Sequence, residues 1–190
     1  MNNRSNYLYE LDLQYDSNRL QQELNDLELE PYFKDNPNKD SWFAGPVTWL
    51  YADVNESKIV KRNTELESLY IQIKILLGTD NITMAVMRQV ANTEVPVHND
   101  KVTQRILDLN GATQIKCAVN IQLGNLVGPI NFPALGSLET YRCALLNVME
   151  DHGVPAFEED RFFIKFKILD VTYQQAVINY NNNIRVDKQY

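Results

Sequence analysis

The chain contains only two histidines, and both lie in a spacing typical of a metal site. His98 is followed by Asp100 two residues later, and His152 is followed by Arg161 nine residues later. Two imidazoles and one carboxylate form the 2-His-1-carboxylate facial triad, a ligand set that suits Fe(II) and leaves coordination positions open for chemistry. The sequence therefore predicts a catalytic metal site made of His98, Asp100 and His152.

The spacing of these residues also indicates how the chain must position them. Residues two apart in an extended segment point to the same side, so one strand end offers both His98 and Asp100 to one cation. His152 must then come from a distant strand folded against the first, as in a jelly roll. Such a ligand set suits iron, copper or zinc in an open site. Two alternatives stay open, namely that His98 lies on a surface loop and that His152 is only a turn residue.

Arg161 begins an alternating segment, 161–168, which predicts a strand. One face of this strand carries Arg161, Phe163, Lys165 and Lys167, and the other face is apolar. A guanidinium that faces into a barrel needs an anion, and its fork matches a carboxylate. The alternative is an internal salt bridge to the acidic run 158–160.

Together, the His98-x-Asp100 pair, His152 and Arg161 resemble the His-x-Asp…His…Arg signature of the Fe(II)/2-oxoglutarate-dependent dioxygenases. The resemblance covers roughly residues 82–168 and is nearest to small hydroxylases of the aspartyl/asparaginyl and prolyl hydroxylase type. One departure is that the aspartyl hydroxylases proper lack the carboxylate ligand that Asp100 supplies here. The resemblance implies a mainly β (α+β) fold, with a double-stranded β-helix (jelly-roll, cupin-like) core and flanking N-terminal helices.

The same resemblance implies a role for each residue. His98, Asp100 and His152 would bind Fe(II), and Arg161 would pair with the distal carboxylate of 2-oxoglutarate. Asn120 is a further candidate to hydrogen-bond this co-substrate, and Lys165 is a second candidate for its carboxylate. With O2, such an enzyme hydroxylates its substrate and releases succinate and CO2. The substrate stays open between a peptide or protein side chain and a small molecule.

Two other functions are compatible with the same residues. A zinc-dependent hydrolase or lyase on a cupin-like barrel would use the three ligands to activate water. A non-catalytic jelly-roll binding module would carry the two histidines incidentally. Arg161 favours the oxygenase, because a keto acid co-substrate needs a cationic partner and a zinc hydrolase does not.

The length of the chain, together with the lack of an internal repeat or a long linker in the sequence, predicts one domain over residues 1–190. Residues 1–80 are predicted to be helices and a loop that buttress a jelly-roll core over 81–175. Helical spacing predicts helices over 17–27 and 66–77, the second with a capping box that begins at Thr64. Strands are predicted at 82–87, 115–123, 141–149 and 161–168, a packed loop at 31–46, and a frayed or loosely docked polar tail at 179–185.

Composition indicates which classes of partner and which cellular location to expect. The 190 residues carry a formal net charge of −7, which makes nucleic acid a disfavoured partner. No apolar run approaches the roughly 20 residues that span a bilayer, and the first residues show no apolar signal segment. Cys117 and Cys143 lie in apolar stretches and are expected to be buried thiols. We therefore expect a soluble cytoplasmic protein, and the sequence leaves the oligomeric state open.

Overall fold

The computed structural model describes residues 3–25, 30–31, 47–52, 64–89, 91–101 and 114–187. The helical segments are η1 (Arg4–Asn6), α1 (Ser17–Asn25), α2 (Glu65–Leu77) and α4 (Tyr173–Asp187). The strands are β1 (Leu8–Glu10), β2 (Glu30–Pro31), β3 (Val47–Ala52), β4 (Ile82–Gln89), β5 (Val95–His98), β6 (Cys117–Gln122), β7 (Pro129–Phe132), β8 (Ser137–Thr140), β9 (Cys143–Leu146), β10 (His152–Val154) and β11 (Arg161–Ile168).

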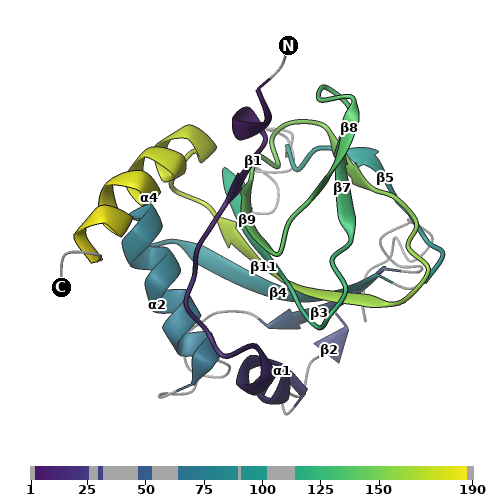
Figure 1. The fold of residues 1–190 in the computed structure, drawn as a ribbon, viewed down its shortest axis with the longest axis horizontal. Coiled ribbons are helices and arrows are strands. Elements are labelled where there is room, and N and C mark those ends of the chain that lie inside the picture. The colour runs from purple at the N-terminus through teal and green to yellow at the C-terminus, as the bar shows by residue number, and fades with distance from the viewer. Residues whose placement is uncertain are drawn as a thin grey trace, which may run out of the picture.

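The strands form two antiparallel sheets that face each other (Figure 1). The larger sheet has the order β1-β9-β6-β11-β4-β3-β2, and the smaller has the order β5-β10-β7-β8. From β4 to β11 the chain crosses repeatedly from one sheet to the other, which is how a jelly roll brings distant segments together. The predicted double-stranded β-helix is confirmed.

The alternation of the strands explains the two layers of apolar packing. Ile164, Phe166 and Ile168 on one face of β11 are fully buried in the layer between the larger sheet and the helices. The opposite face of β11, which carries Arg161 and Lys165, points between the two sheets. Both of these charged residues are buried there, so the layer between the sheets combines apolar packing with two buried charges.

Helix α2 forms as predicted. The hydroxyl of Thr64 accepts the backbone N–H of Glu67 at 3.1 Å, and Gly78 ends the helix in the left-handed conformation with a φ of 62°. The predicted apolar stripe is buried, namely Leu66, Leu69, Ile73, Leu76 and Leu77. Helix α1 also forms, and residues 26–27 of its predicted range lie outside the described residues.

The prediction of a frayed polar tail over 179–185 is wrong, because these residues belong to α4. Figure 1 shows α4 and α2 side by side over the larger sheet. Tyr173, Ala176 and Tyr180 are buried at helical spacing. Two asparagines interpreted as loop residues donate to carbonyls at the end of α2, Asn179 to Leu77 at 2.7 Å and Asn183 to Ile75 at 2.9 Å. A helix end leaves such carbonyls without intrahelical partners, so the polar tail has a packing role.

The N-terminal region also departs from the expected order of helices first and strands afterwards. Strand β1 pairs with β9, and β3 pairs with β4, so both extend the larger sheet. A strand of three residues such as β1 is too short to show a period of two. The predicted strand over 141–149 is shorter than expected, at Cys143–Leu146. The predicted loop falls almost wholly on residues 32–46, outside the described residues.

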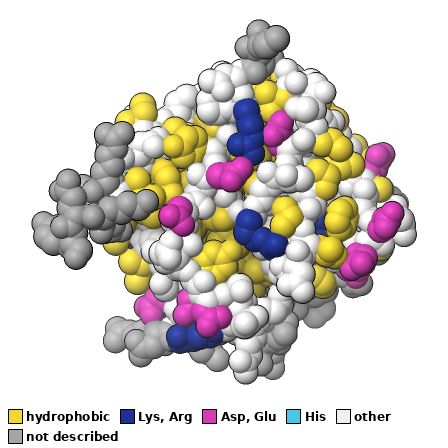
Figure 2. Space-filling model, in the orientation of Figure 1, with side chains coloured by type: hydrophobic (Ala, Val, Ile, Leu, Met, Phe, Trp, Pro, Cys, Tyr) yellow, Lys and Arg dark blue, Asp and Glu magenta, His cyan; other side chains and the backbone are white. Residues whose placement is uncertain are grey.

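The surface face in Figure 2 shows a mixture of side-chain types. On the face shown in Figure 2, basic and acidic side chains are interspersed with apolar ones. Cys117 and Cys143 are free and buried, as predicted. None of the helices in the described part of the chain is long and apolar enough to cross a membrane.

Candidate metal centre

Antiparallel pairing of β5 and β10 brings the two histidines together. His98 and His152 are direct cross-strand partners, and their ring centroids lie 4.5 Å apart. His152 is buried within β10, with 6% of its surface exposed, so the alternative of a turn residue is wrong. His98 ends β5 and is partly buried, which likewise removes the surface-loop alternative.

Each imidazole is oriented by a backbone carbonyl two residues earlier in the chain. Nδ1 of His98 lies 2.8 Å from the carbonyl oxygen of Pro96, and Nδ1 of His152 lies 2.9 Å from that of Glu150. A carbonyl can only accept, so Nδ1 is the protonated nitrogen in both rings and Nε2 keeps its lone pair. This arrangement is typical of metal-ligating histidines, in which the second ring nitrogen donates to a carbonyl or carboxylate.

The protonation state of His152 also suits a ligand. Burial, and next the positive charge of Lys165, lower its pKa to about 4. The imidazole is therefore neutral near pH 7, which is the form that binds a metal ion.

Asp100 completes the cluster. Its backbone N–H donates to the carbonyl of Val148 at 2.9 Å, which fixes the segment after β5. Oδ1 of Asp100 lies 3.6 Å from Nε2 of His98, and one ligand atom from each of His98, Asp100 and His152 lies within 4.8 Å of the others. These three groups therefore converge on one position, as the ligands of a single divalent cation do.

The charge on Asp100 is maintained despite its burial. Burial alone would raise the pKa of this carboxyl group, but the charge of Lys165 and its hydrogen bond to Asp100 outweigh it and hold the pKa well below its usual range. Asp100 is thus an ionised carboxylate beside two imidazoles. The three residues fit a divalent metal, and they are the ones predicted from the sequence.

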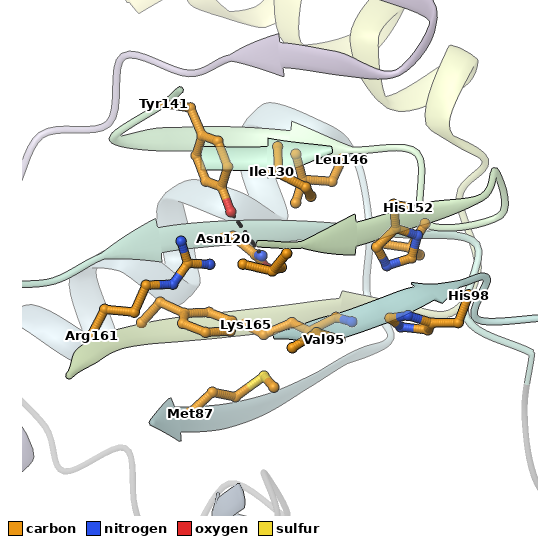
Figure 3. Close-up of a pocket in the computed structure, with 13 residues that line it drawn as sticks. Met87, Val95, His98, Asn120, Ile130, Tyr141, Leu146, His152, Arg161 and Lys165 are labelled. Atoms are coloured by element: carbon orange, nitrogen blue, oxygen red, sulfur yellow. Dashed lines mark hydrogen bonds between the residues drawn. The ribbon is translucent and has the colours of Figure 1, made fainter. Parts of the chain in front are cut away.

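A pocket opens beside the cluster, between the two sheets. Figure 3 shows Arg161 at the end of the pocket opposite His98 and His152, with Lys165 extending between them. Much of the wall is apolar, formed by Met87, Val95, Ile130, Leu146, Val148, Val154 and Phe163. The pocket therefore joins a metal-ligand cluster to a distant cation through a largely apolar space.

Arg161 is a buried cation without an acidic partner in the described part of the chain. Only 4% of its surface is exposed, and burial lowers its pKa. One terminal nitrogen, Nη1, donates to the carbonyl of Pro129 at 3.2 Å, while Nε has no partner among the described residues. The salt bridge to 158–160 that the sequence left open is not among the ion pairs of the described residues. Burying an uncompensated charge is costly, so this geometry indicates an anion site.

The loop before β7 is held against Arg161 by Gln122. The side chain of Gln122 accepts the N–H of Gly128 at 2.8 Å and donates to its carbonyl at 2.9 Å. The loop can lie this close only because residue 128 is glycine: a Cβ there would lie 1.9 Å from Nη1 of Arg161. These hydrogen bonds were not predicted from the sequence, because the approach of a loop backbone to a side chain does not affect the alternation of apolar and polar residues in a strand.

Two further polar side chains face the pocket. Asn120 is 7% exposed, lies opposite Lys165 in the pairing of β6 with β11, and donates to Oη of Tyr141 at 3.2 Å (Figure 3). Burial raises the pKa of Tyr141, so its hydroxyl keeps a proton to donate. Sequence reasoning proposed Asn120 and missed Tyr141, which lies at the start of the largely apolar segment 141–149, where no alternation indicates which face a residue occupies.

Lys165 contacts the metal-ligand cluster. Its ammonium donates to Oδ2 of Asp100 at 2.7 Å, and 6% of its surface is exposed. The sequence offered Lys165 as a second partner for a co-substrate carboxylate. The structure instead pairs it with a candidate metal ligand, on the same strand face as Arg161.

Solved structures share this fold. The chain is similar to the viral collagen prolyl hydroxylase of Paramecium Bursaria Chlorella virus-1 in a complex with 2OG, with a TM-score of 0.55 and 11% identity over 85% of this chain and 95% of that one. For a prolyl-4-hydroxylase of Pseudomonas putida the TM-score is 0.53, with 13% identity over 85% and 90% of the two chains. For HygX of Streptomyces hygroscopicus, with nickel and 2-oxoglutarate bound, it is 0.52, with 14% identity over 87% and 84%.

These comparisons confirm the expected resemblance to the Fe(II)/2-oxoglutarate oxygenases at the level of the fold. A scan against protein-family models finds no match, and a search of curated proteins finds no relative by sequence. At such low identities the likeness carries the architecture alone, so the activity must be argued from the site.

Proposed function

We propose that this protein is an oxygenase that uses Fe(II) and 2-oxoglutarate to hydroxylate an organic substrate. The observation that carries the proposal is the buried guanidinium of Arg161, which has no acidic partner among the described residues and lies across one pocket from the His98, Asp100 and His152 cluster. 2-Oxoglutarate has a keto acid at one end, which chelates a metal, and a carboxylate at the other. A pocket with a metal site at one end and a cation at the other is complementary to both.

The chain's own residues then take distinct roles. His98, Asp100 and His152 would hold Fe(II), with both imidazoles presenting Nε2 because Nδ1 is engaged by a carbonyl. Arg161 would bind the distal carboxylate of 2-oxoglutarate, and the Tyr141 hydroxyl would donate to the same carboxylate. Asn120 donates a hydrogen bond to the oxygen of that hydroxyl, so the hydroxyl proton is not used in this contact and can be donated to the carboxylate.

When bound, iron and 2-oxoglutarate supply the oxidising chemistry: O2 is consumed, 2-oxoglutarate becomes succinate and CO2, and one oxygen atom enters the substrate. The protein supplies ligation, orientation and exclusion of water. Apolar side chains such as Ile130, Leu146 and Phe163 line the pocket and would strengthen the pairing of Arg161 with its anion by lowering the local dielectric constant. The substrate is proposed to be a peptide or protein side chain or a small molecule.

The zinc-dependent hydrolase is a weaker candidate. It would use the same three ligands to activate water, but it would leave the buried charge of Arg161 without a role. The viral prolyl hydroxylase in its complex with 2OG, and HygX with nickel and 2-oxoglutarate bound, share this fold. The fold thus accommodates 2-oxoglutarate in those proteins, and a metal ion in HygX, which supports the oxygenase.

The proposal is tested by adding Fe(II) and then 2-oxoglutarate without oxygen and recording the weak visible charge-transfer band of the chelate. We expect the band in the wild type, no band in Asp100→Ala, and a higher 2-oxoglutarate concentration for half-saturation in Arg161→Ala. Arg19→Ala, at an exposed surface arginine, is the matched control and should match the wild type. A wild type that binds metal but shows no band would contradict the proposal.

A further inference from the structure

Lys165 introduces a positive charge into a cluster whose proposed ligand is itself a cation. The Lys165 side chain is 8% exposed and that of Asp100 is 14% exposed, so their contact is shielded from water. Nζ lies 2.7 Å from Oδ2 of Asp100, the length of a charge-assisted hydrogen bond.

The two oxygens of Asp100 have different neighbours. Oδ1 lies toward His98, at 3.6 Å from Nε2, and Oδ2 is engaged by Lys165. One oxygen therefore faces the metal-ligand cluster while the other is held by an ammonium. A metal bound through Oδ1 and the ammonium on Oδ2 would share a single carboxylate.

We propose that Lys165 is a resident cation that neutralises Asp100 in the metal-free protein and opposes metal binding by electrostatic repulsion. The inference rests on the proposed metal site and adds a property to it: the site folds without its metal, and it binds the metal more weakly than the same three ligands would without Lys165.

Two physical considerations support this role. An ionised carboxylate buried without a partner is strongly destabilising, and Lys165 removes that penalty before any metal arrives. Because Lys165 is buried within β11, its ammonium would stay close to a bound metal ion instead of turning out into solvent.

The sign of the effect follows from comparing two contributions. A hydrogen bond from an outer residue to a metal ligand usually strengthens metal binding by 10- to 100-fold. Here the donor carries a full charge, and a monovalent and a divalent cation sharing one carboxylate in a partly buried site repel by more than that gain. Metal affinity is therefore expected to rise when the charge of Lys165 is removed.

The test compares wild type, Lys165→Met and Lys165→Arg in the full chain. Methionine has nearly the same length without the charge, and arginine keeps the charge, so it serves as the matched control. Co(II) is titrated calorimetrically into each metal-free protein, and melting temperatures are recorded with a chelator and with Co(II). We expect Lys165→Met to bind Co(II) at least tenfold more tightly than the wild type does. With the chelator its melting temperature should be lower than that of the wild type, and Co(II) should raise it by more. Lys165→Arg should remain within about threefold of the wild-type affinity.

The outcomes separate this inference from the metal site itself. If the wild type binds Co(II) and Lys165→Met binds it equally or more weakly, Lys165 only positions Asp100 and the inference is overturned. If Lys165→Met binds Co(II) and the wild type does not, the inference is supported in its strongest form. If neither protein binds Co(II), the metal site fails and the inference fails with it. Should Lys165→Met not fold, Lys165→Gln carries the same expectation.

Discussion

Replacing Gly128 with alanine should displace the guanidinium of Arg161. The added Cβ would lie 1.9 Å from Nη1 and 2.9 Å from both Cδ and Cζ of Arg161, whereas ordinary contacts begin near 3.4 Å. Nη1 would have to move by about 1.5 Å, which breaks its hydrogen bond to the carbonyl of Pro129. Gly128 is not among the glycines with positive φ, so no left-handed backbone conformation disfavours alanine there.

The expected cost has two parts. Overpacking a buried site typically costs about 1–3 kcal/mol of stability, so Gly128→Ala should lower the free energy of unfolding by that amount. A displaced guanidinium also loses its charge-assisted hydrogen bonds to the proposed anion, about 1.5–3 kcal/mol, so 2-oxoglutarate should bind roughly 10- to 150-fold more weakly.

A double-mutant cycle with Arg161→Ala isolates the contact. Urea unfolding is measured for the wild type, each single variant and the double variant. In the Arg161→Ala background the alanine at 128 has no guanidinium to displace, so its cost should fall to near zero. An equal cost in both backgrounds would refute the reasoning, because the new methyl would then be clashing with something other than Arg161.

Three further predictions concern the site and the core. With only two histidines in the chain, NMR titration of the metal-free protein should show His152 neutral down to about pH 4. Because this pKa lies below the unfolded value of about 6.5, the His152 contribution to stability is complete above pH 6.5, and about 3 kcal/mol of it is lost as the pH falls to 4. A His152 titration near 6.5 would contradict this. Tyr141→Phe should weaken 2-oxoglutarate binding to the metal-loaded protein by roughly tenfold, because one hydrogen bond to a charged group is lost; calorimetry showing unchanged affinity would remove Tyr141 from the anion site. Ile73→Ala, in the fully buried core of α2, should cost about 2–5 kcal/mol in urea unfolding, whereas Ile75→Ala, at a side chain 62% exposed, should stay within about 0.5 kcal/mol. Similar costs for the two variants would mean that α2 is packed differently.

The parts of the site that depend on spacing could be predicted from the sequence. The two-residue step from His98 to Asp100 and the alternation of 161–168 place side chains on known faces whatever the rest of the fold does. The jelly-roll expectation then required His152 to lie opposite the first ligand pair, and the pairing of β5 with β10 brings it there. Arg161 was expected to face inward, and it is buried.

Contacts of the site that depend on the register between strands, or on how closely a loop backbone approaches a side chain, could not be predicted from the sequence. The contact of Lys165 with Asp100 depends on how β11 lies relative to the end of β5, which strand alternation does not determine. Tyr141 lies in the largely apolar segment 141–149, which shows no clear alternation. The hydrogen bonds of Gln122 to Gly128 join a side chain to the backbone of a loop. Helix α4 was missed because its asparagines were interpreted as loop residues, whereas two of them satisfy carbonyls of α2.

The most direct test of the account is calorimetric titration of 2-oxoglutarate into the protein without oxygen, with and without Mn(II). The account predicts that one equivalent binds when Mn(II) is present, and that binding is much weaker without the metal or in Arg161→Ala, because the ligand needs both ends of the pocket. No binding to the Mn(II)-loaded protein, or equal binding with and without Mn(II), would contradict the central claim that the metal cluster and Arg161 form one co-substrate site.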